Sequence, residues 1–341
     1  AILAQAIFNR LVAVAGFHNA TTFFAIALHR MGICDVIGSA LFSILLVLLL
    51  VPVWLASVVG LSIARCTPSS RRSACRQHLA TIIITITCLA WRVLLCLCCW
   101  VRLDLEGFDK LNSRLGASGR PCVLTANHTS FMDIILTVAL APACHVGGMK
   151  MLVSNHVMKM PCLGQIIQAM NHVVVPFRKI GSELELGEEA METDKELMVK
   201  RMQVLEDHVA EGGMVAWFPE GLLNKGDPQH LNMFRAGGFV IPVNLDVEVW
   251  CFASVGVQEC WPVKAALGGR PANIMCRLSQ LCESSHACLA TASSFNTMAD
   301  QHARCVYLAN LAHDRTQEMI NEMVVAWRVL RGRPLPMSDC Q

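Results

Sequence analysis

The sequence predicts an α/β fold in which a layered domain, with a mostly parallel sheet flanked by helices, is preceded by one or two membrane helices. Two long apolar runs lie before residue 102. After them, short apolar runs that are typical of buried strands alternate with helical patterns. Only 16% of the 341 residues are charged and 54% are hydrophobic, which is too apolar for an ordinary soluble protein. We therefore expect the surplus of apolar residues to lie in lipid.

The charge balance and the cysteines exclude several classes of protein. Lys and Arg number 28 against 26 Asp and Glu, so a nucleic-acid partner is not expected. The 17 cysteines are odd in number, and no Cys-x-x-Cys pair is matched by a second pair or by spaced histidines. We expect free thiols and no metal site.

The first apolar run contains no charged residue from Val36 to Ala64 and is long enough to cross a bilayer. Pro52 would kink such a helix, which membrane helices tolerate. The second run, Leu79–Val101, carries Arg92 near its middle, and a buried arginine in lipid costs a few kcal/mol. The second run could therefore cross the membrane, or lie tilted, half-inserted or interfacial.

Between the two runs, the segment Arg65–His78 contains four arginines and no acidic residue. The positive-inside rule predicts that this segment is a loop on the cytoplasmic side. Four regions follow from these patterns: an apolar or amphipathic segment at 1–35, membrane helices with a basic loop at 36–101, a globular domain at 102–285, and a C-terminal helical tail at 286–341.

Within the globular domain, the composition becomes that of a soluble α/β protein. Apolar runs bounded by turn residues predict strands at 122–126, 172–175, 214–218 and 247–255. Helical patterns occupy 131–140 and 182–211, and the second of these ends at two glycines.

The first motif with chemical potential follows the strand at 122–126 and opens a helix. It pairs His128 with Asp133 across a turn, and Ser130 followed by Asp133 fits a capping box. A neutral histidine oriented by a carboxylate is suited to act as a general base on a hydroxyl. The alternative from these residues alone is that Asp133 only caps the helix and His128 is a surface residue.

The second motif is Phe218-Pro219-Glu220-Gly221, at the end of the strand at 214–218. A strand that ends in Pro-Glu-Gly makes a tight turn and holds one carboxylate at the edge of the sheet, where α/β folds place ligand groups. An acidic turn residue in solvent is the alternative.

Together, His-x4-Asp and a Phe-Pro-Glu-Gly about ninety residues later resemble the glycerolipid acyltransferase family, over roughly residues 100–260. Arg178 falls where that family has an arginine that contacts the phosphate of the acyl acceptor, and Phe234–Gly237 matches the family's Phe-x-x-Gly. The chain departs from the family at three places, one of which is the family's last block, where Glu248–Phe252 aligns by spacing but has no proline. Leu222-Leu223-Asn224 replaces a Thr-Arg-Ser, so one arginine is absent, and Asn155 replaces a lysine.

The resemblance implies an O-acyltransferase similar to 1-acyl-sn-glycerol-3-phosphate acyltransferases. It would move a fatty acyl group from acyl-CoA or acyl carrier protein to a hydroxyl of lysophosphatidic acid, with acyl-CoA as co-substrate and no other cofactor. His128 would be the base, with Asp133 orienting it. Pro219, Glu220, Gly221 and Arg178 would bind the acceptor. The expected location is an endomembrane such as the endoplasmic reticulum, with the site facing the cytoplasm.

Three alternatives remain open. Within acyltransferases, the acceptor could be glycerol 3-phosphate or a lysophospholipid with a head group. A catalytically silent membrane scaffold would keep the fold without the reaction. A serine or cysteine hydrolase of lipids is disfavoured, because the sequence has no G-x-S-x-G elbow and no recognisable cysteine nucleophile motif.

Overall fold

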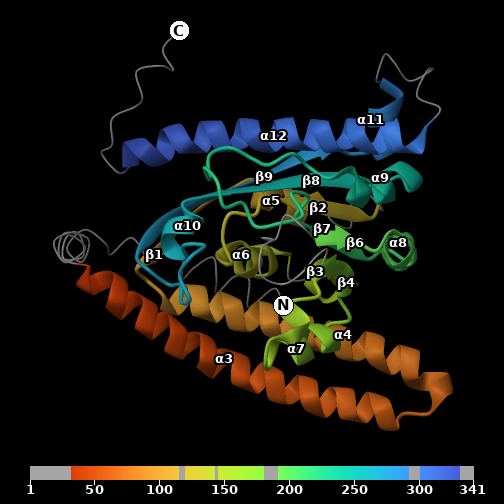
Figure 1. The fold of residues 1–341 in the computed structure, drawn as a ribbon, viewed down its shortest axis with the longest axis horizontal. Coiled ribbons are helices and arrows are strands. Elements are labelled where there is room, and N and C mark those ends of the chain that lie inside the picture. The colour runs from red at the N-terminus through yellow and green to blue at the C-terminus, as the bar shows by residue number, and fades with distance from the viewer. Residues whose placement is uncertain (1–31, 115–119, 143–144, 180–190, 292–299, 331–341) are drawn as a thin grey trace.

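A computed structural model places most of the chain, and Figure 1 shows its arrangement. The structure describes residues 32–114, 120–142, 145–179, 191–291 and 300–330. The segment expected at 1–35 therefore lies almost wholly outside the described residues.

The core is a seven-stranded sheet in the order β1-β9-β8-β2-β7-β3-β4. All neighbouring strands are parallel except the pair β8 and β9, so the predicted mostly parallel sheet is confirmed. β5 and β6 form a separate antiparallel pair. The strands are β1 Val101–Glu106, β2 Cys122–Ala126, β3 Met149–Ser154, β4 Val173–Val175, β5 Phe177–Lys179, β6 Met191–Thr193, β7 Met214–Trp217, β8 Glu248–Val255 and β9 Ala272–Cys282.

Helices flank both faces of this sheet, as predicted. They are α3 Ile33–Cys66, α4 Ser69–Leu97, α5 Phe108–Arg114, α6 Met132–Leu140, α7 Leu163–Ala169, α8 Lys195–Ala210, α9 Val240–Asn244, α10 Val257–Cys260, α11 Ser285–Thr291 and α12 Gln301–Leu330. Three 3₁₀ turns, at Val146–Gly148, Val157–Lys159 and Ala236–Phe239, complete the described elements.

The helix predicted over 182–211 is wrong at its start. Within the described residues, the segment first forms strand β6 and becomes helical only at Lys195. The side chain of Asp194 accepts a hydrogen bond from the backbone N–H of Leu197 at 3.1 Å. This cap fixes the beginning of α8, because an N-cap residue leaves the helical conformation on its N-terminal side.

Helices α3 and α4 are each long and apolar enough to cross a membrane by length and composition. α3 continues through Pro52. The prediction of a basic loop at 65–78 is wrong, because only Thr67 and Pro68 separate the two helices. Arg65 lies at the end of α3, and the other three arginines of this segment lie on the first turns of α4. Pro68 allows this tight connection, because proline favours the position just before or at the start of a helix.

Arg92, on α4, does not face outward. The residue is 5% exposed, and its guanidinium donates from Nε to the carbonyl oxygen of Ala139 at 2.7 Å and from Nη2 to that of Ala141 at 2.6 Å. These are carbonyls at the C-terminal end of α6, which have no partner within their helix. The arginine that makes the second apolar run doubtful as a span therefore binds the α/β domain, and it places no charge on the outer face of α4.

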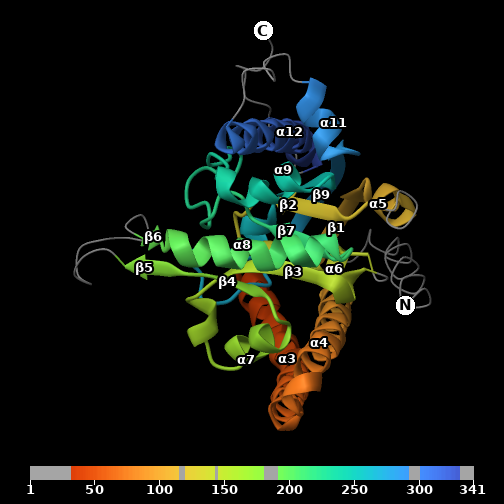
Figure 2. The same cartoon turned by 90° about the vertical axis from the view of Figure 1, so that its right-hand side faces the viewer.

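The two faces of the sheet carry separate cores. One face packs against α4, α6 and part of α3, and the other packs against α8, α9 and α12. Figure 2 shows α12 on the side opposite α3 and α4. Side chains of α12 such as Leu308, Ile320 and Trp327 are buried in the second core. The boundary predicted at residue 285 thus separates α12 from a core to which it contributes.

Candidate active site

The ends of two neighbouring strands bring the two motifs together. β2 and β7 are parallel and paired, so the residues that follow them leave the same edge of the sheet. His128 follows β2 and Glu220 follows β7. Glu220 Oε1 accepts a hydrogen bond from the backbone N–H of His128 at 2.8 Å, although the two residues are far apart in sequence.

Asp133 lies in the first turn of α6 and is fully buried. Its Oδ2 accepts hydrogen bonds from the backbone N–H groups of Thr129 at 2.7 Å and Ser130 at 2.8 Å. The Oγ of Ser130 accepts from the N–H of Met132 at 3.1 Å. This is close to the predicted capping box, with the regular helix beginning two residues after Ser130.

The imidazole of His128 lies beside the same carboxylate. Its Nδ1 is 3.5 Å from Asp133 Oδ2, and its side chain is 14% exposed. The ring stacks on Phe218 with centroids 4.1 Å apart and planes at 18°. With Nδ1 turned toward the buried carboxylate, the opposite nitrogen, Nε2, is the one available to a substrate, which is the arrangement a general base requires.

The Pro-Glu-Gly segment forms a β-turn. The N–H of Gly221 donates to the carbonyl of Phe218 at 3.0 Å, with proline at the second position and glycine at the fourth, as such turns favour. Gly221 has a φ of 77°, which is strained for residues with a side chain. The carbonyl of Pro219 accepts from the N–H of Arg235 at 2.8 Å, so this turn is tied to a later loop.

Glu220 is 4% exposed, and both its carboxylate oxygens bind backbone amides. Oε1 accepts from His128 and Oε2 accepts from the N–H of Asn232 at 3.0 Å. Burial raises the pKa of this carboxyl above its ordinary value, and the two backbone hydrogen bonds partly oppose the rise. In this structure Glu220 holds the backbone of His128, and its predicted contact with an acceptor stays a prediction.

Three polar residues that the sequence motifs did not identify also support His128. Asn224, 4% exposed, donates its N–H to the carbonyl of His128 at 2.7 Å. Asn127 accepts at Oδ1 from the N–H of Ser254 at 2.8 Å and donates from Nδ2 to the carbonyl of Ser254 at 3.0 Å. Ser254, in β8, donates from Oγ to Asp133 Oδ1 at 2.8 Å. A serine late in an apolar strand gives no signal that it will meet a carboxylate from another element.

The Ser254 hydroxyl therefore holds the second oxygen of Asp133. We expect Ser254→Ala to lower kcat about three- to thirtyfold with little change in KM, because it removes one charge-assisted hydrogen bond from a carboxylate that orients the base. The two hydrogen bonds between the Ser254 backbone and the Asn127 side-chain amide do not depend on this hydroxyl. Steady-state kinetics measure the effect, and Ser254→Thr should restore most of it. A lower melting temperature with unchanged kcat would assign Ser254 to stability alone.

The remaining predicted site residue, Arg178, lies in β5, where it pairs in register with Glu192 of β6. The position of its side chain is outside what the structure describes. Its predicted contact with an acceptor phosphate therefore stays a prediction.

The cysteines near the site are poorly suited to be nucleophiles. Burial raises the pKa of Cys260, in α10, to about 12, and it also raises the pKa of Cys251 and Cys276. A thiol with a raised pKa carries little thiolate at neutral pH, and the thiolate is the reactive form. Every cysteine in the described part of the chain is a free thiol, and no metal-binding group of three or more His, Cys, Asp or Glu occurs there.

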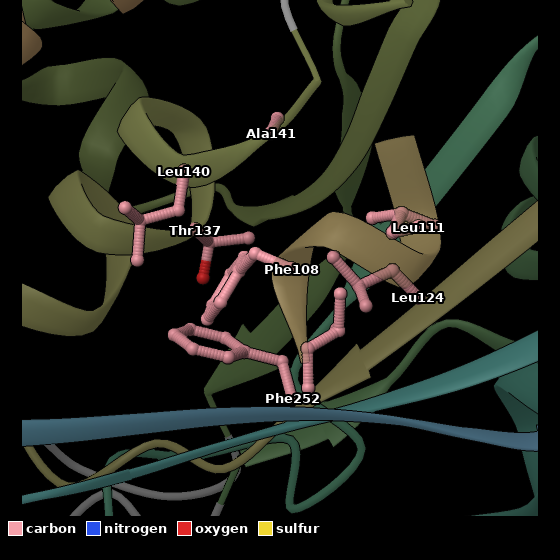
Figure 3. A pocket seen from close by; sticks show the side chains of 8 residues that line it. Phe108, Leu111, Leu124, Thr137, Leu140, Ala141 and Phe252 are labelled. Atoms are coloured by element: carbon pink, nitrogen blue, oxygen red, sulfur yellow. The ribbon is translucent and has the colours of Figure 1, made fainter. Parts of the chain in front are cut away.

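A small apolar hollow lies beneath α6, near the end of that helix opposite His128, and its volume is about 10 Å³. Figure 3 shows side chains from α5, α6 and the sheet converging on it. The hydroxyl of Thr137 in its wall already donates to the carbonyl of Asp133 at 2.8 Å. Since pockets for drug-sized ligands are usually about 300–1,000 Å³, we assign no substrate to this hollow.

Comparison with known proteins points to one family. Residues 102–254 match the sequence model of the family described as Acyltransferase. The chain is 26% identical over 161 residues to the 1-acyl-sn-glycerol-3-phosphate acyltransferase BAT2, chloroplastic, of Brassica napus, a match that covers 47% of this chain and 39% of that protein. The match thus spans about two fifths of that relative's length.

The fold is also similar to a solved one. The crystal structure of PlsC, the 1-acyl-sn-glycerophosphate (LPA) acyltransferase from Thermotoga maritima, aligns with a TM-score of 0.55 and 15% identity, over 85% of this chain and 96% of that chain. At this identity the likeness concerns the fold. The resemblance indicated by the two motifs is thereby confirmed for residues 102–254, which match the acyltransferase family model.

Proposed function

We propose that this chain is a membrane-bound O-acyltransferase that moves a fatty acyl group from acyl-CoA to the free glycerol hydroxyl of lysophosphatidic acid. The observation that carries the proposal is the pair His128 and Asp133, which lies just after the C-terminal end of β2. His128 Nδ1 and Asp133 Oδ2 are 3.5 Å apart. This pair lies within a domain that matches the acyltransferase family.

In the proposed reaction, His128 Nε2 takes the proton from the acceptor hydroxyl as its oxygen attacks the thioester carbonyl carbon. Asp133 stabilises the imidazolium that forms and keeps the ring in the required orientation. The carbon–sulfur bond then breaks, and the leaving thiolate takes the proton from Nε2. The acceptor is itself the nucleophile, so no acyl-enzyme is required.

The acceptor would bind at the turn that follows β7. The turn at Pro219 and Gly221 adjoins His128 through Glu220, and the buried Glu220 fixes this spacing. Arg178 would bind the acceptor phosphate, because a guanidinium offers a fork of donors that suits phosphate oxygens.

The lipid substrates would reach the site from the apolar helices. Phe131, next to the His128 loop, is 41% exposed, and its ring centroid lies 5.8 Å from that of Trp261. Trp261 in turn contacts Phe42 of α3 at 5.7 Å. The outer face of the helix pair exposes large apolar side chains, which suit lipid: Val36, Ile37, Ile44, Val47, Leu48, Leu55, Val59, Ile63, Ile82, Ile86 and Leu89.

We also propose that the α3–α4 connection and the α/β domain lie on the same, cytoplasmic side, since Arg65, Arg71, Arg72 and Arg76 are exposed there and α4 packs on the domain. In sealed vesicles with the cytoplasmic face outward, we expect Ser70→Cys and Met233→Cys to react with an impermeant maleimide. The background carries serine at the exposed Cys66, Cys99 and Cys162.

Reaction of Ser70→Cys only after detergent treatment would place the connection in the lumen and contradict the proposed orientation. If only Met233→Cys needs detergent, α4 crosses the membrane and the domain lies on the opposite side from the connection.

The test of the proposed function is a panel of acceptors. Purified protein with labelled acyl-CoA is offered lysophosphatidic acid, glycerol 3-phosphate, lysophospholipids with a head group, and water. We expect the highest kcat/KM with lysophosphatidic acid. A preference for another glycerol acceptor would keep the reaction class and change the substrate, and transfer to none of them would favour a silent scaffold.

A further inference from the structure

Arg235 is held at the Pro-Glu-Gly turn by its backbone. Its N–H donates to the carbonyl of Pro219 at 2.8 Å. The preceding residue, Phe234, is buried in the second core and meets the ring of His313 edge-on at 5.2 Å. The following residues form the 3₁₀ turn Ala236–Phe239, whose last residue is fully buried. With both neighbours anchored, the position from which the Arg235 side chain extends is fixed.

The side chain of Arg235 lies over Gly221. A Cβ built at residue 221 would lie 2.5 Å from Arg235 Nε, 2.7 Å from Cδ and 2.9 Å from Cζ. The φ of 77° favours glycine at residue 221, and a side chain there would push the Arg235 guanidinium away from the turn. The arginine and the turn are fitted to each other.

The guanidinium of Arg235 is exposed and carries no hydrogen bond or ion pair to any residue that the structure describes. The nearest acidic residue along the turn, Glu220, is buried and directs both oxygens to backbone amides. By contrast, the half-buried Arg277 is paired with Glu106 and the exposed Arg120 with Asp246. An unpaired guanidinium at this turn is available to an anionic ligand.

The same turn touches the proposed base. Within it, Phe218 stacks on the His128 ring and Glu220 accepts from the His128 N–H. Arg235 contacts the two neighbours of Glu220: its side chain lies against Gly221, and its backbone N–H binds Pro219. A ligand bound by Arg235 would thus lie next to the residues that hold His128, since Gly221 directly follows Glu220.

We propose that Arg235 binds the phosphate of the acyl acceptor and so selects phosphate-bearing acceptors. The inference rests on the proposed function. The phosphate of lysophosphatidic acid or glycerol 3-phosphate is only a few covalent bonds from the hydroxyl that His128 would deprotonate, so both must bind close to one turn. In the nucleotide part of acyl-CoA, the phosphates lie a whole pantetheine arm away from the thioester, which favours the acceptor as the source.

Arg235 supplies a positive charge that the residues directly after Gly221 do not. The three residues after Gly221, Leu222-Leu223-Asn224, carry no positive charge. Arg235, from a loop further along the chain, places a positive charge at the same turn. Guanidinium suits this role better than ammonium, because it can form two parallel hydrogen bonds to a phosphate.

The experiment compares Arg235→Ala and Arg235→Lys with the native enzyme on two acceptors, lysophosphatidic acid and monoacylglycerol, which lacks the phosphate. Arg201→Ala serves as the matched control, because Arg201 is an exposed arginine on α8. We expect Arg235→Ala to raise the KM for lysophosphatidic acid about ten- to hundredfold, with the KM for monoacylglycerol and acyl-CoA unchanged. Arg235→Lys should recover part of the loss.

Equal changes for both acceptors would overturn the proposal, and so would a rise confined to the KM for acyl-CoA. Gly221→Ala, which displaces the guanidinium, should show the same selective loss as Arg235→Ala. Direct titration of lysophosphatidic acid into detergent-solubilised His128→Ala protein, with and without Arg235→Ala, gives a readout that does not need turnover. Weaker binding without Arg235 supports the site even if no transfer is found, and equal binding overturns it.

Discussion

Replacement of His128 by alanine should abolish acyl transfer while the protein stays folded. The imidazole supplies the base of the proposed reaction, and general-base assistance contributes about 10²- to 10⁴-fold. Its structural contribution is small by comparison, because the N–H and carbonyl of His128, which bind Glu220 and Asn224, belong to the backbone and remain in the variant. The side chain adds only its stacking on Phe218 and its proximity to Asp133.

The measurement is the initial rate with labelled acyl-CoA and lysophosphatidic acid, together with the melting temperature in detergent. His302→Ala is the matched control, since His302 is an exposed histidine at the start of α12. Undiminished turnover in His128→Ala would overturn the site assignment. An acylated cysteine or serine found by mass spectrometry with acyl-CoA alone would instead overturn the direct mechanism.

The sequence predicts the strands beside the site well because their patterns are local. β2 and β7 are short, wholly buried runs bounded by Pro, Asn or Gly, so composition and punctuation mark them. The motifs that follow them could be paired in space from the sequence alone, because parallel strands release their next residues at one edge. That His128 and Asp133 meet follows from the turn between them.

Other elements carry a signal that composition does not reveal. β9 alternates buried and half-buried residues from Ala272 to Leu278, a pattern with period two that marks a strand, but its polar positions are also typical of a loop. β9 is also the strand that breaks the parallel order, by pairing antiparallel with β8. Such pairing depends on chain direction, which local pattern does not specify.

The long-range polar contacts could not be predicted at all. From the sequence, Arg92 is an unfavourable charge within an apolar helix. Only the tertiary fold places the carbonyls at the end of α6 within hydrogen-bonding distance of it. Ser254 and Arg235 likewise acquire their roles from elements distant in sequence. A single polar side chain has no period, so its partner is specified by tertiary packing and not by its neighbours.

Asp133→Asn should lower kcat about 10²- to 10⁴-fold with little change in either KM, because it removes the charge that stabilises the His128 imidazolium. The fold should persist. An asparagine can keep its oxygen on the N–H groups of Thr129 and Ser130 and turn its amide toward the Ser254 hydroxyl, which can accept as well as donate. The loss is therefore one of charge and not of the helix cap.

Two comparisons make this prediction specific. Asp207→Asn, at an exposed aspartate on α8, should leave turnover unchanged. The double variant His128→Ala with Asp133→Asn should be little slower than His128→Ala alone, because groups that act as one unit are not additive. If the two losses instead multiply, Asp133 acts independently of the imidazole, and its three hydrogen bonds to Thr129, Ser130 and Ser254 would be its whole role. The product of the two single effects, compared with the measured double effect, therefore decides whether the 3.5 Å approach of Nδ1 to Oδ2 is a catalytic contact.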